Sequence, residues 1–413
     1  MTRIVIVNQH GENRGDEAAL RAMIGALAEA LDGEVEFDVV VQFRDRSLTL
    51  AFDETVRLHH MVMPLPDIAR LGAYALARAA TLDAGRILPR DARAIVEAIA
   101  AADLVISAPG GPYFGDLYAG HEPVHWLYVW LAALHQRPLY LYAPSAGPFD
   151  KPLHNVFRRR VYSLFDGLSV REERSAEHLH ELLGADAEID LTADSALQVD
   201  VPPIDRGTYF SGPRAALADR FVVAVSGMQY AYPGDPDPPS QRAAFTEAFV
   251  ACLAHLVARR RCHVVFLPQL YGRVHDDRAY HELLGRRLPP GTSWEVVPAA
   301  LDATGHRAVI AMADLCLMSR YHPQIFATSR CVPGVFVVYE HKQEAYLEAV
   351  GMRDYAFDIR ALEPAVMCAR LDEVLERRDE LVERLRARIG AVRERSRTTT
   401  RRALDVLRAG REA

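Results

Sequence analysis

The sequence of 413 residues contains only five cysteines, and no two of them are spaced as Cys-x-x-Cys. This spacing excludes a zinc ribbon and a thioredoxin-type motif, and an odd number without a framework indicates a reducing compartment. Each cysteine is predicted to be a small, buried, apolar side chain. The five are Cys252, Cys262, Cys316, Cys331 and Cys368.

Long apolar runs are also missing. The run at residues 4–7 is too short for the core of a signal peptide. The most apolar later stretch, residues 126–134, falls short of the roughly 20 residues that cross a bilayer. We therefore expect a soluble cytoplasmic protein, and peripheral contact with the inner face of the membrane stays open.

The chain has no excess of positive charge. Its 48 Lys and Arg residues stand against 55 Asp and Glu residues, for a formal net charge of -7, so nucleic acid is not an expected partner. Half of the residues are apolar and a quarter are charged, which excludes a disordered chain, a collagen-like chain and a coiled-coil rod. At roughly 150 residues per domain, the length predicts two domains or one large one.

Short runs rich in Val, Ile and Leu alternate with helical patterns, which predicts buried parallel strands in doubly wound α/β layers. Turn residues between 201 and 213 interrupt this alternation, which then restarts. We predict an N-terminal domain over 1–204, a C-terminal domain over 205–370, and a helical segment rich in Arg and Glu over 371–413. The expected strands are 4–7, 35–41, 104–107, 139–143, 166–170, 221–226, 263–267, 295–297, 315–318 and 335–338, and the expected helices are 17–31, 92–102, 175–183, 241–259 and 371–408.

Six polar or glycine-rich segments directly follow expected strands. In doubly wound sheets, ligands bind at the carboxyl ends of the strands. We therefore expect these segments to line one cleft between the two domains, with a small phosphate-bearing anion as the ligand. The segments are 11–16, 108–116, 145–148, 170–175, 319–323 and 339–342.

The segments of the first domain supply small and acidic residues. Gly15 permits close approach of the backbone, and Asp16 either caps the following helix or acts on a substrate hydroxyl. Arg171 either reaches into the cleft or forms a structural salt bridge, and Ser175 is the expected N-cap of the next helix. The remaining candidates line the cleft or form ordinary strand-to-helix turns; they are Asn13, Gly110, Gly111, Asp116, Ser145 and Gly147.

The sharpest segment is Ser319-Arg320-Tyr321-His322-Pro323, directly after an expected strand. The guanidinium fork of Arg320 matches phosphate or carboxylate oxygens, and His322 can exchange protons near neutral pH. The alternative is a helix start with Pro323 at an early position. Lys342 follows the next strand and either adds a cation to the cleft or lies in a surface turn.

Taken in order, these motifs resemble the polysaccharide pyruvyl transferases over about residues 4–358. The sequence departs from the family pattern at Pro112, where a third glycine is common, and at Ser195, where a proline is common. The matching motifs are Asn13-Arg14-Gly15-Asp16, Gly110-Gly111-Pro112 with Asp116, Ala146-Gly147-Pro148, Val170-Arg171-Glu172-Glu173-Arg174-Ser175, Asp194-Ser195-Ala196-Leu197, Ser319-Arg320-Tyr321-His322 and Tyr339-Glu340-His341-Lys342.

The resemblance implies a GT-B-like α/β fold of two Rossmann-like domains with a C-terminal helix, the first domain on the acceptor side and the second on the donor side. It implies transfer of pyruvate from phosphoenolpyruvate to a sugar of a cell-surface polysaccharide or glycolipid precursor, usually as a cyclic ketal. The acceptor is in some members lipid-linked, and neither metal nor cofactor is implied. By motif position, Arg171, Arg320 and His322 serve the donor, with Tyr321 and Lys342 beside them.

The chemistry suggests the roles of these residues. In this hypothesis, His322 protonates the methylene carbon, and Arg171 and Arg320 hold the anion, while Asp16 is the base on the acceptor hydroxyl. Two alternatives stay open: a GT-B nucleotide-sugar glycosyltransferase, and a catalytically inactive binding protein of a glycan pathway.

Overall fold

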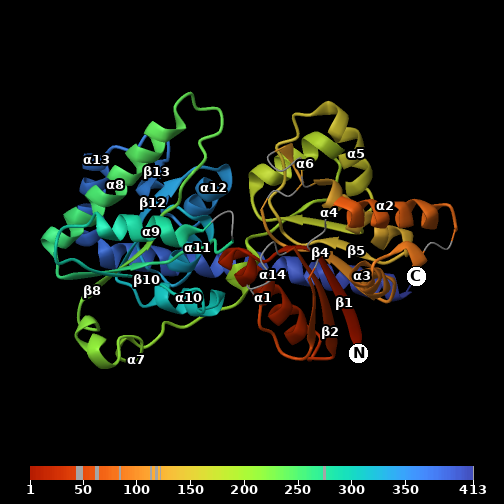
Figure 1. Ribbon diagram of the computed structural model, residues 1–413, viewed down its shortest axis with the longest axis horizontal. Helices are drawn as coiled ribbons and strands as arrows, with labels where there is room; N and C mark the ends of the chain where they lie inside the picture. The colour runs from red at the N-terminus through yellow and green to blue at the C-terminus, as the bar shows by residue number, and fades with distance from the viewer. Residues whose placement is uncertain are drawn as a thin grey trace. The chain divides into compact units, whose positions relative to one another are not determined.

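The computed structural model describes residues 1–42, 50–60, 65–82, 85–111, 114–116, 120, 122–272 and 276–412. Pro112, one of the two departures from the family pattern, lies outside the described residues. The chain forms two compact units (Figure 1). Unit 1 consists of Met1–Glu12, Asp16–Val199 and Arg393–Ala413, and unit 2 of Asn13–Gly15 and Asp200–Val392.

Unit 1 is built around a parallel sheet with the strand order β3-β2-β1-β4-β5-β6-β7. Its strands are β1 (Thr2–His10), β2 (Val35–Gln42), β3 (Val56–His60), β4 (Leu104–Ser107), β5 (Leu139–Leu141), β6 (Gly167–Val170) and β7 (Asp190–Leu191). Its helices are α1 (Arg14–Ala30), α2 (Leu65–Ala79), α3 (Arg90–Ala100), α4 (Glu122–Leu134), α5 (Pro152–Tyr162) and α6 (Glu173–Leu183).

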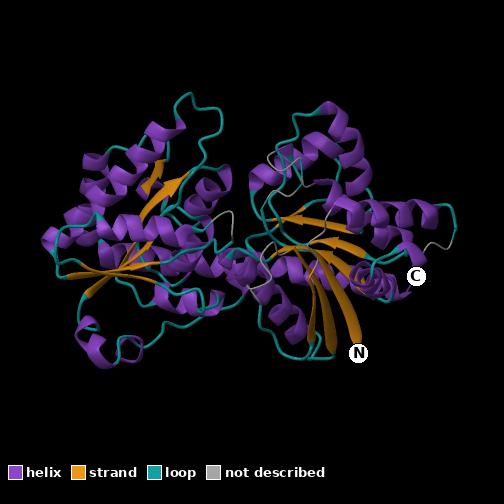
Figure 2. Cartoon of the chain, viewed as in Figure 1, coloured by secondary structure: helices purple, strands orange, loops and turns teal. Residues whose placement is uncertain are grey.

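The two faces of this sheet carry separate apolar cores because successive side chains of a strand point to opposite faces. Val5 and Val7 of β1 pack in the cluster that also holds residues of α2 to α6. Ile4 and Ile6 pack in the other cluster, with α1 and the end of the C-terminal helix. Figure 2 shows the strands covered by helices, as the continuous apolar sequence of the central strands requires.

Unit 2 repeats this plan with the strand order β10-β9-β8-β11-β12-β13, again all parallel. Its strands are β8 (Phe221–Ser226), β9 (Cys262–Phe266), β10 (Ser293–Val296), β11 (Leu315–Met318), β12 (Gly334–Val338) and β13 (Ala356–Asp358). Its helices are α7 (Arg206–Tyr209), α8 (Pro238–Arg259), α9 (Asp277–Arg286), α10 (Ala303–Ala311), α11 (Tyr321–Ser329), α12 (His341–Ala349) and α13 (Pro364–Glu376). Short 3₁₀ helices are Gly85–Ile87 and Ser195–Gln198 in unit 1, and Gly212–Leu217 and Arg353–Tyr355 in unit 2.

The last helix, α14 (Arg378–Glu412), is shared by the two units, which divide it between Val392 and Arg393. Its first half buries Leu381, Leu385 and Ile389, spaced at one helical face. In its second half, Thr399 exchanges a hydrogen bond with the hydroxyl of Tyr140 (3.2 Å). The backbone oxygen of Ser396 accepts a hydrogen bond from the side chain of Gln198 (2.8 Å), so polar contacts as well as apolar ones anchor this half in unit 1.

The two-sheet α/β architecture and the C-terminal helix confirm the predicted fold class, but several details were wrong. The expected helix 371–408 is two helices, α13 and α14, and the first begins already at Pro364 because proline is tolerated in a first turn. Ser175 is not an N-cap: Glu172 occupies that position, and the Ser175 hydroxyl instead accepts a hydrogen bond from the amide of Ala146 (2.8 Å). The short strands β3, β7 and β13 were not anticipated.

No helix among the described residues is both long enough and apolar enough to pass through a bilayer.

Candidate functional site

The order of each sheet reverses at one pair of neighbouring strands, β1 and β4 in unit 1 and β8 and β11 in unit 2. Such switch points open a crevice at the carboxyl ends of the strands, where doubly wound proteins bind ligands. The segments after β1, β4 and β11 are three of the six that the sequence singled out.

Arg320 stands directly between β11 and α11 in unit 2, at the N-cap position of the helix. Its guanidinium donates a hydrogen bond to Oδ1 of the buried Asp277. The other oxygen of Asp277 accepts from the amides of Gln269 and Leu270, both at 3.0 Å. Burial alone would raise the pKa of Asp277, but Arg320 and His281 lower it below its usual value, so the carboxylate is ionised and holds Arg320 in one orientation.

Residues 13–15 lie in unit 2 although they follow the first strand of unit 1. The amide of Arg14 donates to the carbonyl of Gln269 (3.0 Å), and its guanidinium donates to the carbonyl of Ala299 (2.6 Å). The guanidinium carbon also lies 4.8 Å from the ring centroid of Tyr271. Asn13 accepts the amide proton of Gly15 (2.8 Å), so its side chain closes the turn.

Gly15 lies against the imidazole of His322. A Cβ atom placed on Gly15 would overlap three atoms of the His322 side chain, including Nδ1. Only glycine therefore fits here without moving the imidazole. His322 is the second residue of α11, is buried, and packs against the rings of Tyr321 and Phe326.

Lys342, in the first turn of α12, reaches the same neighbourhood. Its ammonium is paired with the carboxylate of Glu340 and lies 5.6 Å from the ring centroid of Tyr321. The side chain of Gln343 donates to the carbonyl of Ser319 (2.9 Å), which ties the segment after β12 to the segment after β11. Unit 2 thus brings together Gly15, Tyr321, His322 and Lys342 in one continuous set of contacts.

Arg171 in unit 1 is buried in a cluster of polar side chains. Its guanidinium donates to Asp194 (2.6 Å) and to the hydroxyl of Ser145 (3.0 Å), and it lies 3.3 Å from a carboxylate oxygen of Glu172. Two carboxylates around one guanidinium leave the cluster with no positive excess. This is the arrangement that the salt-bridge interpretation of Arg171 predicts. The hydrogen bond to Ser145 also brings two of the candidate residues together.

The other candidates of unit 1 belong to a tight crossing of loops. The amide of Asp116 donates to the carbonyl of Pro148 (2.9 Å). Gly115 and Gly147 lie so close that a Cβ placed on Gly115 would be 2.7 Å from the carbonyl oxygen of Gly147. The carboxylate of Asp116 accepts from Arg158 (2.8 Å). Asp116 and Gly147 therefore both help to hold the loops of unit 1 together.

Three further candidates lie at the switch point of unit 1. The carbonyl of Gly110 accepts from the amide of Ser145 (3.2 Å), and Gly111 is partly buried. Asp16 is buried near the start of α1, and its backbone oxygen accepts from the side chain of Gln9 (3.2 Å).

Three residues, His10, His125 and Asp277, escaped the reasoning from sequence. His10, the last residue of β1, lies with its Nε2 atom 3.2 Å from that of the buried His125 on α4. Asp277, which orients Arg320, is 43 residues away from it in the chain. His10 lies between the expected strand 4–7 and the polar segment 11–16 and could have been found by extending that segment, whereas His125 and Asp277 carry no local signal.

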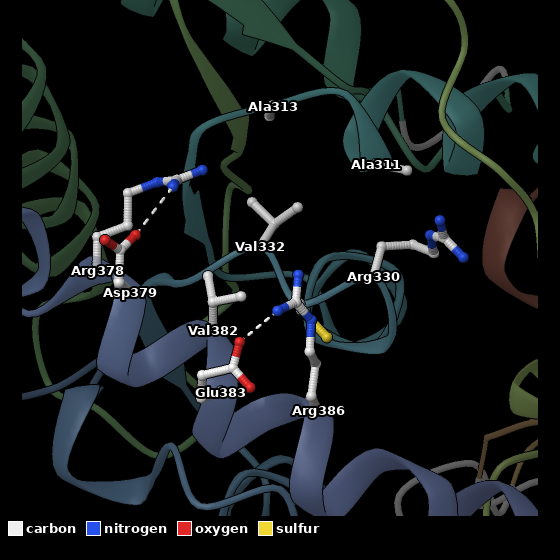
Figure 3. Close-up of a pocket in the computed structure, with 10 residues that line it drawn as sticks. Ala311, Ala313, Arg330, Val332, Arg378, Asp379, Val382, Glu383 and Arg386 are labelled. Atoms are coloured by element: carbon white, nitrogen blue, oxygen red, sulfur yellow. Dashed lines mark hydrogen bonds and ion pairs between the residues drawn. The ribbon is translucent and has the colours of Figure 1, made fainter.

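A cavity of about 330 Å³ lies in unit 2 at the opposite edge of the sheet, before β11 and β12 (Figure 3). Its arginines are paired: Arg330 with Asp200, Arg386 with Glu383, and Arg378 with the backbone oxygen of Asp314. It lies apart from the segments described above. Within the described ranges, no group of three or more His, Cys, Asp or Glu side chains is placed to hold a metal ion.

The two parallel sheets and their switch points define a GT-B-like protein. The chain belongs to the polysaccharide pyruvyl transferase family, whose model matches residues 13–341. It is also similar to the amylovoran biosynthesis protein AmsJ of Erwinia amylovora, with 25% identity over 399 residues that cover 92% of this chain and 93% of that protein. The family predicted from the ordered motifs is therefore confirmed.

Solved structures share the fold at low sequence identity. Sucrose-phosphate synthase of Thermosynechococcus elongatus has a TM-score of 0.60 and 13% identity, and the match covers 99% of both chains. HepE of Anabaena in complex with UDP-glucose has a TM-score of 0.58 and 13% identity, covering 99% of this chain and 100% of that one. MnaA of S. aureus, solved with UDP, has a TM-score of 0.56 and 14% identity, covering 93% and 90%.

Proposed function

We propose that this chain transfers pyruvate from phosphoenolpyruvate to two hydroxyls of one sugar, as a cyclic ketal, in a cell-surface polysaccharide or glycolipid precursor. One observation carries the proposal: in a member of the polysaccharide pyruvyl transferase family, Arg320 and His322 follow the switch-point strand β11 of unit 2. The relative AmsJ, named for amylovoran biosynthesis, supports a polysaccharide product.

The charges at this edge of unit 2 suit the donor. Phosphoenolpyruvate carries a phosphate and a carboxylate, and the guanidinium of Arg320 can present two parallel N–H groups to either. Asp277 holds Arg320 from one side, so less side-chain entropy is lost when the donor binds. We propose that Lys342 supplies the second cation, with Tyr321 between it and His322.

The proposed reaction begins with protonation of the donor by His322. The imidazolium gives its proton to the methylene carbon, which becomes the methyl group, and positive charge develops at C2. A sugar hydroxyl attacks C2 and loses its proton to the neutral imidazole. The second hydroxyl then displaces phosphate from C2, and its proton leaves on the phosphate, so that protons and charge balance. Arg320 stabilises the charge that develops on the leaving phosphate.

The roles of the unit 1 candidates stay predictions. These are a donor contact for Arg171, Asp16 as the base for the first hydroxyl in place of the neutral imidazole, and substrate contacts for Gly110, Gly111, Asp116, Ser145 and Gly147, as well as for Asn13 in unit 2.

The test is a pair of substitutions at the unit 2 edge. His322→Ala should lower phosphate release from phosphoenolpyruvate by about 10²–10⁴-fold, because one general acid is lost, while the donor still raises the melting temperature. Arg320→Lys should instead weaken donor binding by about tenfold or more, since a point charge replaces the fork. Phosphate release is measured with a panel of nitrophenyl glycosides as acceptors, and binding by thermal unfolding.

Arg287→Lys is the matched control, because Arg287 forms an exposed ion pair with Glu247 on the surface of unit 2. It should leave both measurements unchanged. Stabilisation by UDP-glucose and not by phosphoenolpyruvate would reject the proposal in favour of a nucleotide-sugar transferase. Full activity of His322→Ala would reject the assignment of the acid.

A further inference from the structure

Helix α5 of unit 1 exposes apolar side chains where a surface helix normally carries polar ones. Leu153 is 81% exposed, and Val156 and Phe157 are each 62% exposed. Their spacing of three and four residues places them on one face of the helix. No other run of five described residues holds three exposed large apolar side chains.

The opposite face of α5 carries a charge into the interior. Arg158 is fully buried and forms hydrogen bonds with both carboxylate oxygens of the buried Glu122 (2.9 and 2.8 Å) and with Asp116 (2.8 Å). Val161 and Tyr162 of α5 are buried as well and pack in the apolar core of unit 1. The core contacts of α5 thus come from Arg158, Val161 and Tyr162, while Leu153, Val156 and Phe157 stay exposed.

Basic residues border this apolar face. Lys151 stands just before the helix, and Arg159 and Arg160 are exposed near its end. The helix itself contains no Asp or Glu, although the whole chain has a formal net charge of -7. The neighbouring helix α4 has one acid, the buried Glu122, and the exposed acid closest in sequence is Asp150. The face is thus apolar at its centre and cationic at its margin.

An aromatic pair extends the face onto α4. The indole of Trp126 stacks on the ring of Phe157, with centroids 6.3 Å apart and planes inclined by 20°. The indole therefore continues the apolar surface of Phe157 onto α4. Figure 1 shows α4 and α5 in the same group of helices in unit 1.

We propose that the α5 face, formed by Leu153, Val156 and Phe157 with Lys151, Arg159 and Arg160, docks on the surface of an anionic phospholipid bilayer. The apolar side chains enter the boundary between headgroups and acyl chains, and the cations meet lipid phosphates. The helix lies in the plane of the membrane and does not cross it. Because this inference concerns where the protein acts and not which donor it uses, it does not rest on the proposed function.

The test is sedimentation of the full-length protein with lipid vesicles. The protein should pellet with vesicles of phosphatidylglycerol and phosphatidylcholine at low salt, and much less with phosphatidylcholine alone. The triple variant Leu153→Ser/Val156→Ser/Phe157→Ser should bind at least about tenfold more weakly. Arg159→Gln/Arg160→Gln should lose about fivefold per cation at low salt, and the loss should shrink as salt rises.

The matched control replaces exposed apolar residues of unit 2, Leu283 (43% exposed) and Val366 (46% exposed), by serine. This double variant should bind vesicles like the wild type. Circular dichroism and thermal unfolding check that every variant is folded. As an independent readout, the Trp126 fluorescence should shift to shorter wavelength with anionic vesicles, and Trp126→Phe should abolish most of that shift.

Equal binding of the wild type and the triple variant, or no binding to anionic vesicles at all, would overturn the proposal. A second copy of the chain is the competing occupant. If the wild type is a dimer by analytical ultracentrifugation and the triple variant a monomer, with no vesicle binding by either, the α5 face is a dimer interface and the proposal is wrong. Neither result bears on phosphate release from phosphoenolpyruvate.

Discussion

Gly15 and His322 pack directly against each other. The imidazole occupies the space that a side chain at position 15 would fill, so the position of the ring depends on the absence of that side chain. Arg14 fixes the same segment by hydrogen bonds to backbone oxygens and by its contact with Tyr271. The first polar segment of the chain is therefore part of the surroundings of His322.

Gly15→Ala should displace the His322 imidazole and lower the turnover number by about tenfold to 10²-fold, less than the about 10²–10⁴-fold expected for complete loss of a general acid. In the double variant Gly15→Ala/His322→Ala, the new methyl group meets no imidazole. Its turnover should therefore match that of His322→Ala alone, as measured by phosphate release in a double-mutant cycle. Additive losses would show that Gly15 acts through something other than the imidazole.

Gly25→Ala is the control on the same helix. Position 25 is exposed, and a Cβ there would have only an ordinary contact, 4.0 Å from Val199. The substitution should leave turnover unchanged and raise the free energy of unfolding by about 0.5–1 kcal/mol, because alanine favours helix more than glycine does.

At the scale of single elements, α5 depends on one buried cation. Arg158→Met should lower the free energy of unfolding by about 3–5 kcal/mol, since Glu122 would remain buried without its partner. Adding Glu122→Gln should recover most of this loss, because the amide oxygen can still accept from Gly115 while the charge is gone. Urea unfolding of the two variants measures this; a double variant as unstable as the single one would contradict the explanation.

A strand or helix was predicted correctly where its own sequence carries a clear pattern of apolar and turn residues. The strands at 104–107, 221–226 and 315–318 are found at the expected residues, because short apolar runs between turn residues identify buried parallel strands. Helix α5 gave no such signal, since its exposed face is apolar and its buried face holds Arg158. The edge strand β7 has only two residues, too few for any pattern.

The candidate site likewise contains residues that local sequence identifies and residues that only the fold brings together. The rule that polar groups follow strands found Arg320, His322 and Lys342, because connectivity alone places them at the carboxyl ends. It gave no hint of Asp277, the first residue of α9, which is far from Arg320 in the chain, or of Asp194, which pairs with Arg171. Arg171 shows why such partners matter: sequence alone left its two interpretations open, and the structure pairs its guanidinium with the carboxylates of Asp194 and Glu172.

Taken as a whole, the molecule should lose stability in mild acid because of two buried histidines. Burial lowers the pKa of His281 to about 4, although Asp277 opposes this, and burial together with Arg14 lowers the pKa of His306 to about 3. The unfolded chain binds protons at these histidines near the ordinary value of 6.5, whereas the native protein does not until much lower pH. Their contribution to stability is therefore full above pH 6.5 and declines as the pH falls toward 4.

The free energy of unfolding should fall by about 1.4 kcal/mol per pH unit for each of these histidines within this window. His306→Gln should remove its share of the slope, even though loss of the hydrogen bond to Tyr271 lowers stability at every pH. Urea unfolding at pH 7, 6, 5 and 4.5 measures the slope. An unchanged slope in the variant would contradict the assignment to His306.

The division of the chain between its units has a practical consequence for expression. A gene cut between Val199 and Asp200 would yield a first fragment that ends before residues 393–412, so the hydroxyl of Tyr140 and the amide of Gln198 would lose their partners. The second fragment would lack Asn13, Arg14 and Gly15, and with them the hydrogen bonds from Arg14 to the carbonyls of Gln269 and Ala299. Each unit contains a segment that is encoded on the other side of the cut, so the protein is best produced from one uninterrupted reading frame.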